Sequence, residues 1–173
     1  MEAIEWLRSR EPGFAELTPA DRTAINHFQL LWSLFECRNL DTRGNPAAII
    51  QVARTLHDSG RLQMAPLLPA LRYFQKRYVE NGATNYRFDH LQLRNADHPE
   101  LVRSVMLGTA TSPPDIAAAL LLIIYRYRNN LHHGLKWAYD IQGQRSNFRT
   151  ASRVLMSVMD MFSLPQGAAL AEG

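Results

Sequence analysis

The stretch Ile116-Ala-Ala-Ala-Leu-Leu-Leu-Ile-Ile-Tyr125 is the most apolar part of the chain and decides the fold. Ser112-Pro-Pro-Asp115 precedes it and matches a helix start, in which a hydroxyl side chain is followed by proline. The helical pattern continues to His133, and the next residue, Gly134, is of a type that commonly ends helices. A run of ten apolar residues is too short to cross a bilayer, which needs about 20. The sequence therefore predicts a long helix buried inside a protein.

Three more amphipathic helices are expected to pack against this one. The first follows the start signal Thr18-Pro19 and runs to about residue 39, the second lies between Pro46 and about residue 59, and the last covers roughly 144–163. Apolar residues recur in them at spacings of three and four, which gives each helix one buried face. The expected core includes Phe28, Leu31, Phe35, Leu56, Leu120, Ile124, Leu155 and Phe162.

The remaining segments are less regular. A short amphipathic piece at about residues 2–9 ends at Pro12-Gly13, and glycines, asparagines and prolines interrupt an insert at about residues 60–112. No alternation typical of strands rises above noise. We therefore expect an all-α fold, an up-down four-helix bundle with an N-terminal helical extension and a partly helical insert. Residues 1–164 would form this single domain, and residues 165–173 a flexible tail.

Composition narrows the setting of the protein. The chain has 173 residues, which fits one domain, and its single cysteine, Cys37, excludes an intrachain disulfide and a four-cysteine zinc site. We expect Cys37 to be buried and inert. The N-terminus carries acidic residues where a signal peptide would carry basic ones. These features predict a cytoplasmic protein without a membrane segment.

Charge is spread unevenly along the chain. Residues 1–60 carry a net charge of −2 and residues 61–173 a net charge of +5, and 17 of the 19 basic residues are arginine. Arginine binds phosphate oxygens in a bidentate way that lysine does not match. The pattern permits nucleic-acid binding, although a bias in codon usage would give the same composition.

The segment Arg126-Tyr-Arg128-Asn129-Asn-Leu-His132-His133-Gly-Leu-Lys136 gathers groups that bind phosphate or transfer protons at the end of the most apolar helix. On a helix of about 100° per residue, Arg128 and His132 project only about 40° apart. A plainer interpretation also exists, because cations at a helix C-terminus are stabilised by the helix dipole.

Arg128-Asn129-Asn-Leu-His132-His133-Gly134 resembles the signature of the HEPN superfamily, whose members are nucleases and nucleotide-binding domains of prokaryotic defence, toxin and CRISPR systems. That signature is an arginine, then a polar residue, then a histidine four to six positions beyond the arginine. The context is similar too, since the motif ends the third of four expected helices. The segment 28–36, with its acidic Glu36, also looks like the first helix of such bundles.

The resemblance implies a metal-independent endoribonuclease without a cofactor that acts as a homodimer in a bacterial defence or toxin–antitoxin system. Its products would carry 2′,3′-cyclic phosphate and 5′-hydroxyl ends, and an antitoxin or another defence protein would be its partner. Arg128 would hold the scissile phosphate, His133 would transfer the proton with His132 as its substitute, and Asn129 would position either group. A HEPN-like module that binds RNA, nucleotide or a protein without cleaving is the alternative.

Two departures from the signature leave assignments open. His132 stands where many members carry an apolar residue, so either histidine can be the motif residue, and Arg126 with His132 also satisfies the spacing. Leu135 occupies the position at which one toxin branch has tyrosine, which argues against nucleotidylation at that site.

Residues outside the motif have expected roles as well. Glu36 is a candidate to orient Arg128 across the bundle, or is an ordinary acid of an amphipathic helix. The RNA backbone would follow a basic set composed of Arg126, Lys136, Arg145, Arg149 and Arg153. Asp89-His90 and Asp97-His98 do not have a recognised metal-ligand spacing, and we interpret them as loop polarity.

Overall fold

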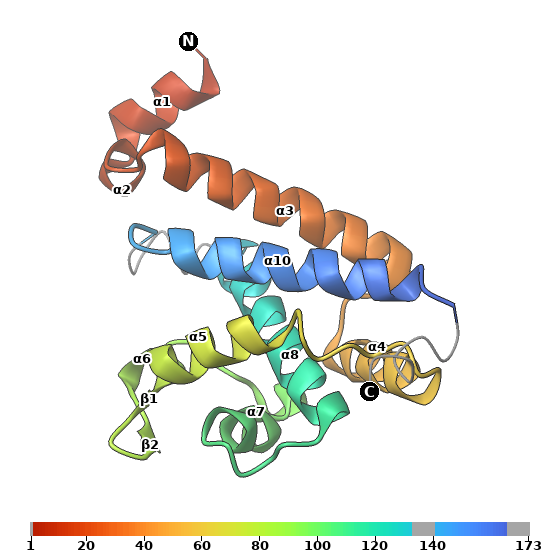
Figure 1. The fold of residues 1–173 in the computed structure, drawn as a ribbon. Helices are drawn as coiled ribbons and strands as arrows, with labels where there is room; N and C mark the ends of the chain where they lie inside the picture. Colours follow the sequence, from red (N-terminus) through yellow and green to blue (C-terminus); the bar gives the residue numbers. More distant parts are fainter. Residues whose placement is uncertain (1, 133–140, 166–173) are drawn as a thin grey trace.

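The computed structural model describes residues 2–132 and 141–165, and helices dominate this part of the chain (Figure 1). The predicted all-α class is confirmed, and in these two ranges the strands are limited to one two-stranded hairpin. The helices are α1 (Ala3–Arg10), α2 (Pro12–Ala15), α3 (Pro19–Asn39), α4 (Pro46–Asp58), α5 (Leu68–Tyr78), α6 (Tyr86–Asp89), α7 (Pro99–Met106), α8 (Pro113–His132) and α10 (Arg145–Phe162), with a 3-10 turn η1 (Asn95–Asp97) and strands β1 (Val79–Glu80) and β2 (Ala83–Thr84).

Helix α8 forms the centre of the fold. Every side chain from Ile116 to Ile124 is buried, as expected for a helix that is apolar on all sides. Helices α4, α7, α10 and α5 contact it. The most apolar stretch of the sequence is therefore the element around which the other helices pack.

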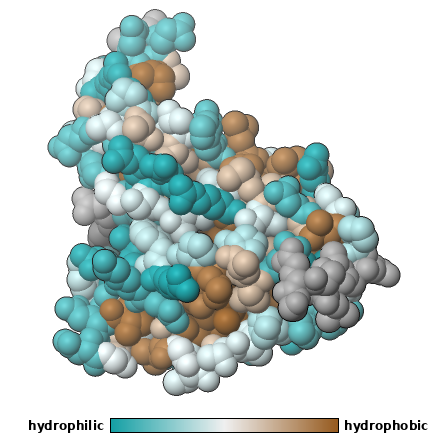
Figure 2. All heavy atoms as spheres, viewed as in Figure 1, coloured by the Kyte–Doolittle hydropathy of each residue, from teal (hydrophilic) through white to brown (hydrophobic). Residues whose placement is uncertain are grey.

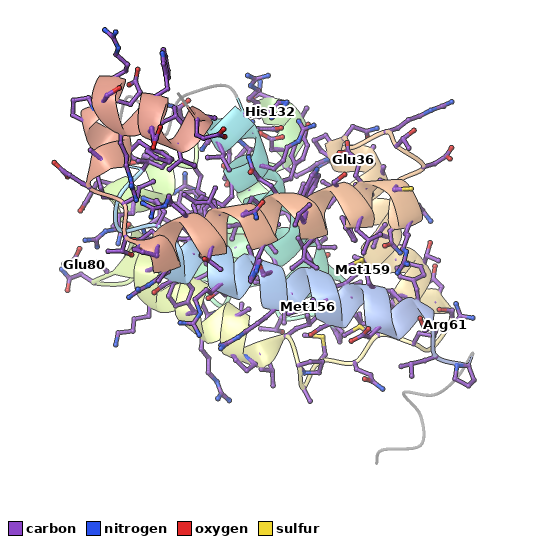
Figure 3. The ribbon with its side chains drawn as sticks, turned by 90° about the horizontal axis from the view of Figure 1, so that it is seen from above. Glu36, Arg61, Glu80, His132, Met156 and Met159 are labelled. Atoms are coloured by element: carbon purple, nitrogen blue, oxygen red, sulfur yellow. The ribbon has the colours of Figure 1, made fainter. Side chains whose placement is uncertain are left out.

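Helices α3 and α10 pack lengthwise against each other, and both begin at the same end of the molecule (Figures 1 and 3). The expected up-down order is therefore wrong for this pair, because neighbouring helices of such a bundle run antiparallel. The rings of Phe28 and Phe148 meet between them with centroids 5.1 Å apart. Of the predicted core, six residues are fully buried, while Leu31 and Phe162 are partly buried against it. The fully buried six are Phe28, Phe35, Leu56, Leu120, Ile124 and Leu155.

Local signals explain where the long helices start. The hydroxyl of Thr18 accepts from the backbone N–H of Asp21, and the carboxylate of Asp21 accepts from the backbone N–H of Thr18, which forms a capping box. Proline follows at the first helical position, where its missing N–H costs nothing. Asn45 caps α4 through a single bond, its side chain accepting from the N–H of Ala48.

The insert at residues 60–112 is partly helical, as predicted, and it contributes more of the core than its weak pattern indicates. It holds α5, the hairpin, α6, η1 and α7, and Phe74, Phe88 and Val102 are buried in it. The hairpin turns at Asn81 and Gly82, both with positive φ, which is the residue pair that a tight two-residue turn favours.

The face of the molecule seen in Figure 2 is mostly hydrophilic and carries separate apolar patches. Leu30 and Leu34 of α3 and Met156 of α10 are exposed, as are Ile4 and Trp6 of α1. The expectation that Cys37 is buried is wrong, because its side chain is exposed near the end of α3. Among the described helices, none combines the length and the apolar character that a membrane span requires.

Candidate active site at the end of helix α8

The two arginines near the C-terminal end of α8 point in different directions. Arg126 and Arg128 lie two positions apart, so about 200° of helical rotation separates them. Arg126 is buried with a relative exposure of 3%, whereas 30% of the Arg128 side chain is exposed. Only Arg128 can reach a ligand, which agrees with the motif, since the polar Asn129 follows Arg128 whereas Tyr127, a poorer polar match, follows Arg126.

Arg126 belongs to the core. Its Nη1 lies 3.4 Å from Oδ2 of Asp97, its Nε donates to the carbonyl oxygen of Leu91 at 3.1 Å, and its Nη2 donates to Oδ1 of Asn130 at 3.2 Å. Burial lowers the pKa of the Arg126 guanidinium, and the charge of Asp97 opposes that shift. The prediction that Arg126 binds RNA is therefore wrong, and the alternative pairing of Arg126 with His132 is removed with it.

Asp97 has a defined structural role. Besides holding Arg126, its Oδ2 accepts from the backbone N–H of Arg94 at 2.7 Å. The interpretation of Asp97 as loop polarity is wrong, because its carboxylate is buried and joins the insert to α8. In the described ranges, no three side chains of His, Cys, Asp or Glu are grouped as a metal site would need.

Arg128 faces α3 and meets Glu36 there. Nη2 of Arg128 lies 3.8 Å from Oε2 of Glu36, and Nη1 donates to Oδ1 of Asn129 at 3.0 Å. Asn129 is itself buried, so its amide oxygen holds the Nη1 side of the guanidinium in place. The structure thus brings together three of the residues that the sequence singled out: Arg128, Asn129 and Glu36.

The carboxylate of Glu36 is fixed independently of Arg128. Nε1 of Trp32 donates to Oε2 at 2.9 Å, and the backbone N–H of Gly44 donates to Oε1 at 3.1 Å. A β-carbon at position 44 would lie only 2.3 Å from Oε1, so with any larger residue there the Glu36 carboxylate would have to shift from this position. The sequence alone did not identify Trp32 or Gly44 as supports of the site. Gly44 lies in the connection between α3 and α4, where no helical pattern points to it.

A groove of about 230 Å³ lies between α3 and the end of α8. Glu36 and Arg128 line one part of it, and the exposed His132 lies at the end of α8 on the same side of α3 as Glu36 (Figure 3). Apolar and small polar residues complete the lining: Phe28, Gln29, Trp32, Ser33 and Leu131. A cation, a carboxylate and an imidazole in one groove can bind a phosphate and transfer a proton.

The sequence predicts two further site residues beyond the end of α8. His133 and Lys136 lie outside the described residues, as does Gly134. The described part of the motif therefore includes Arg128, Asn129 and His132, and the choice between the two histidines stays a prediction.

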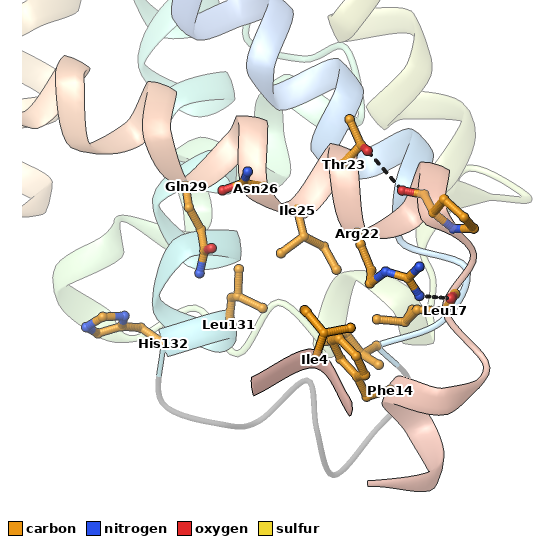
Figure 4. Close-up of a pocket in the computed structure, with 12 residues that line it drawn as sticks. Ile4, Phe14, Leu17, Arg22, Thr23, Ile25, Asn26, Gln29, Leu131 and His132 are labelled. Carbon is orange, nitrogen blue, oxygen red and sulfur yellow. Dashed lines mark hydrogen bonds between the residues drawn. The ribbon is translucent and has the colours of Figure 1, made fainter. Parts of the chain in front are cut away.

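A second and larger pocket, of about 710 Å³, adjoins this groove (Figure 4). Both are lined by Gln29, Leu131 and His132. The larger pocket extends from there along α3 towards Phe14 and Ile4 of the N-terminal helices.

The three arginines of α10 lie apart from Arg128. All are exposed, and Nε of Arg145 is 3.9 Å from Oδ1 of Asp21. Arg149 and Arg153 line a groove of about 430 Å³ between α3 and α10 together with Leu30, Leu31 and Met156. Met156 and His132 lie on opposite sides of α3 in Figure 3. The predicted basic track on α10 is thus surface-exposed but does not continue the Arg128 groove within one chain.

A buried pair of tyrosines joins α8 to α5 next to the motif. The hydroxyls of Tyr78 on α5 and Tyr127 on α8 are hydrogen-bonded to each other. Burial raises the pKa of Tyr78 to about 12, and burial also raises the pKa of Tyr127. On α5, the hydroxyl of Tyr73 donates to Oδ1 of Asn147 at 2.7 Å. These contacts hold α5 against both α8 and α10.

Comparison of the chain with protein-family models, with curated proteins and with solved structures gave no match. The site is therefore interpreted from its own geometry and chemistry.

Proposed function

We propose that the protein is a metal-independent endoribonuclease of the HEPN type that acts in the cytoplasm as a homodimer. The observation that carries the proposal is Arg128, which lies partly exposed in a groove with its guanidinium between Asn129 and Glu36. A bacterial defence or toxin–antitoxin system is the proposed setting, with an antitoxin or another defence protein as the partner.

The chemistry follows from the residue types. The 2′-hydroxyl of the substrate attacks the adjacent phosphorus, the bond to the 5′-oxygen breaks, and the products are a 2′,3′-cyclic phosphate and a 5′-hydroxyl. A histidine accepts the proton of the 2′-hydroxyl and another supplies a proton to the leaving oxygen, because imidazole titrates near neutral pH. Arg128 stabilises the negative charge that develops on the phosphate oxygens. Asn129 and Glu36 keep the Arg128 guanidinium in position.

A homodimer supplies the second proton carrier. Attack and departure occur on opposite sides of the phosphorus, and neighbouring histidines on one helix project about 100° apart. A two-fold axis near the end of α8 would bring Arg128, Asn129 and His133 of both chains around one cleft. A strict monomer at micromolar concentration that still cleaves RNA, as measured by sedimentation, would refute the composite site.

Cleavage of a labelled single-stranded RNA in EDTA tests the proposal. Replacing Arg128 or His133 with alanine should reduce the rate by about 10²- to 10⁴-fold, the range for removing a charge-stabilising or acid–base group. Arg72→Ala and His57→Ala are matched controls, since both residues are exposed on other helices, α5 and α4. Full cleavage by the Arg128→Ala protein would reject the assignment.

The same assay distinguishes the alternative. An Arg128-dependent binding of RNA or nucleotide without turnover supports a non-catalytic HEPN-like module. The large pocket beside the groove is the observation that keeps this alternative in consideration, because binding pockets of this size are few in a protein.

A further inference from the structure

The 710 Å³ pocket beside the Arg128 groove has the size and lining of a small-molecule site. Pockets that enclose ligands of nucleoside size fall within about 300–1,000 Å³ and combine apolar walls with a few polar groups. The walls here are formed by Ile4, Ile25 and Leu131, with Phe14 beneath them (Figure 4). Because Gln29, Leu131 and His132 line both cavities, a ligand in this pocket lies next to one held by Arg128.

Most polar groups of the lining already have partners. Nη1 of Arg22 donates to the carbonyl oxygen of Leu17 at 2.6 Å, and its guanidinium lies 5.8 Å from the centroid of the Phe14 ring. The hydroxyl of Thr23 donates to the carbonyl oxygen of Pro19 at 2.9 Å. These contacts fix the rim of the pocket and leave these groups little capacity to select a ligand.

Asn26 and Gln29, whose side chains are carboxamides, differ from Arg22 and Thr23 in their hydrogen bonding. Asn26 and Gln29 lie three residues apart on α3, so both project from one side of the helix, and both are exposed. Within the described part of the chain, neither side chain takes part in a hydrogen bond. Figure 4 shows Gln29 extending towards Leu131, one turn after Asn26. Each carboxamide offers one acceptor oxygen and two donor hydrogens to a ligand.

We infer that this pocket is a nucleobase subsite in which Asn26 and Gln29 select adenine. A carboxamide pairs through two hydrogen bonds with the N6–N7 edge of adenine, and on that edge adenine alone among the bases presents a donor beside an acceptor. The aliphatic side chains of Ile25 and Leu131 supply the flat apolar contact that a base needs on its faces. The inference rests on the proposed function for the position of the base, which would adjoin the phosphate that Arg128 holds. Cleavage would then be selective for phosphates next to an unpaired adenosine.

Binding of nucleotides tests the subsite without requiring turnover. Calorimetric titration of the full chain with the 3′-monophosphates of adenosine, guanosine, cytidine and uridine should show tightest binding for adenosine. The Asn26→Ala/Gln29→Ala protein should lose about 5- to 150-fold of that preference, the range expected for one bidentate pair. Gln51→Ala, an exposed glutamine on α4, is the matched control and should leave the preference unchanged. Equal binding of the four nucleotides, or a preference unaffected by the double substitution, overturns the subsite.

Cleavage separates this inference from the proposed function. On RNAs of one sequence with a single adenosine moved along them, the ratio of cleavage beside adenosine to cleavage elsewhere should fall in the double variant, whatever the overall rate. A chain that binds adenosine monophosphate through Asn26 and Gln29 but cleaves no RNA retains the subsite and rejects the nuclease. Arg128-dependent cleavage with an unchanged ratio retains the nuclease and rejects the subsite. Thermal unfolding of each variant confirms that it is folded, as exposed helical positions tolerate alanine well.

Discussion

Arg126 and Asp97 form an ion pair inside the protein, with Nη1 of Arg126 3.4 Å from Oδ2 of Asp97 and each side chain 3% exposed. The pair joins the insert to the central helix, since Asp97 belongs to η1 and Arg126 to α8. Two residues further along α8, Arg128 lies in the candidate active site. The structural and the proposed chemical roles of this helix end are thus divided between two arginines.

Removing Asp97 should destabilise the fold strongly. In the Asp97→Ala protein the guanidinium of Arg126 remains buried without its counter-charge, and breaking a buried pair in this way costs about 3–5 kcal/mol. Urea unfolding followed by circular dichroism measures the loss. Asp89→Ala is the control, because Asp89 is exposed and its removal should change the free energy of unfolding by about 0.5 kcal/mol or less. Equal effects of the two substitutions would show that the ion pair contributes no stability.

The tyrosine pair predicts a loss of stability in alkaline solution. The pKa of Tyr78 is raised to about 12 in the folded protein, so between pH 10 and 12 the folded state retains a proton that the unfolded state releases. Stability is therefore complete below pH 10 and falls by about 1.4 kcal/mol per pH unit for each such group above it. Unfolding measured from pH 9 to 12 should show this decline, and Tyr78→Phe should make it shallower. Tyr86→Phe, at a position that is 58% exposed, should leave the pH dependence unchanged, and parallel curves for all three proteins would contradict the prediction.

Gly44→Ala should impair the candidate site through Glu36. The new β-carbon would stand 2.3 Å from Oε1 of Glu36, so the carboxylate must move and can no longer hold Arg128. A displacement of about 1 Å in a site can cost about 10²-fold in rate, which the RNA cleavage assay would measure. The double variant Glu36→Ala/Gly44→Ala should be no slower than Glu36→Ala alone, since residues in one contact network are not additive. Fully additive losses would mean that Gly44 acts by another route.

The arginines of α10 should determine the salt dependence of RNA binding. If Arg149 and Arg153 each contact one phosphate, removing both lowers the slope of log affinity against log salt by about 1.4 for single-stranded RNA. Fluorescence anisotropy at several salt concentrations measures that slope. Arg54→Ala/Arg72→Ala removes the same charge from exposed positions on α4 and α5 and should leave the slope unchanged. Equal slopes for the two double variants would place the RNA elsewhere.

Local signals made the long helices predictable from the sequence. Thr18 and Asn45, each followed by proline, fix the starts of α3 and α4 through contacts within four residues. The apolar run that begins at Ile116 is likewise a local signal, and it identifies α8 as a central helix. The hairpin was missed because strands of two residues are too short to show alternation, although the pair Asn81-Gly82 is itself a turn signal.

The candidate site was only partly predictable, because much of it depends on contacts between distant segments. Glu36 could be proposed as a partner of Arg128 from the helical context, and the structure places the two side chains together. The burial of Arg126 depends on Leu91 and Asp97, which lie in an insert whose pattern is weak. Spacing along α8 alone gives no means of separating Arg126 from Arg128.

The close approach of Gly44 to Glu36 has a consequence for the way relatives of this protein are recognised. A larger residue at position 44 would disturb the arginine of the motif while leaving every letter of the motif unchanged. A survey that identifies nucleases by the Arg–Asn–x–x–x–His pattern would count such a chain as active. Under the proposed nuclease function, glycine at the position matching Gly44 and an acid matching Glu36 would therefore provide a second criterion for an intact site.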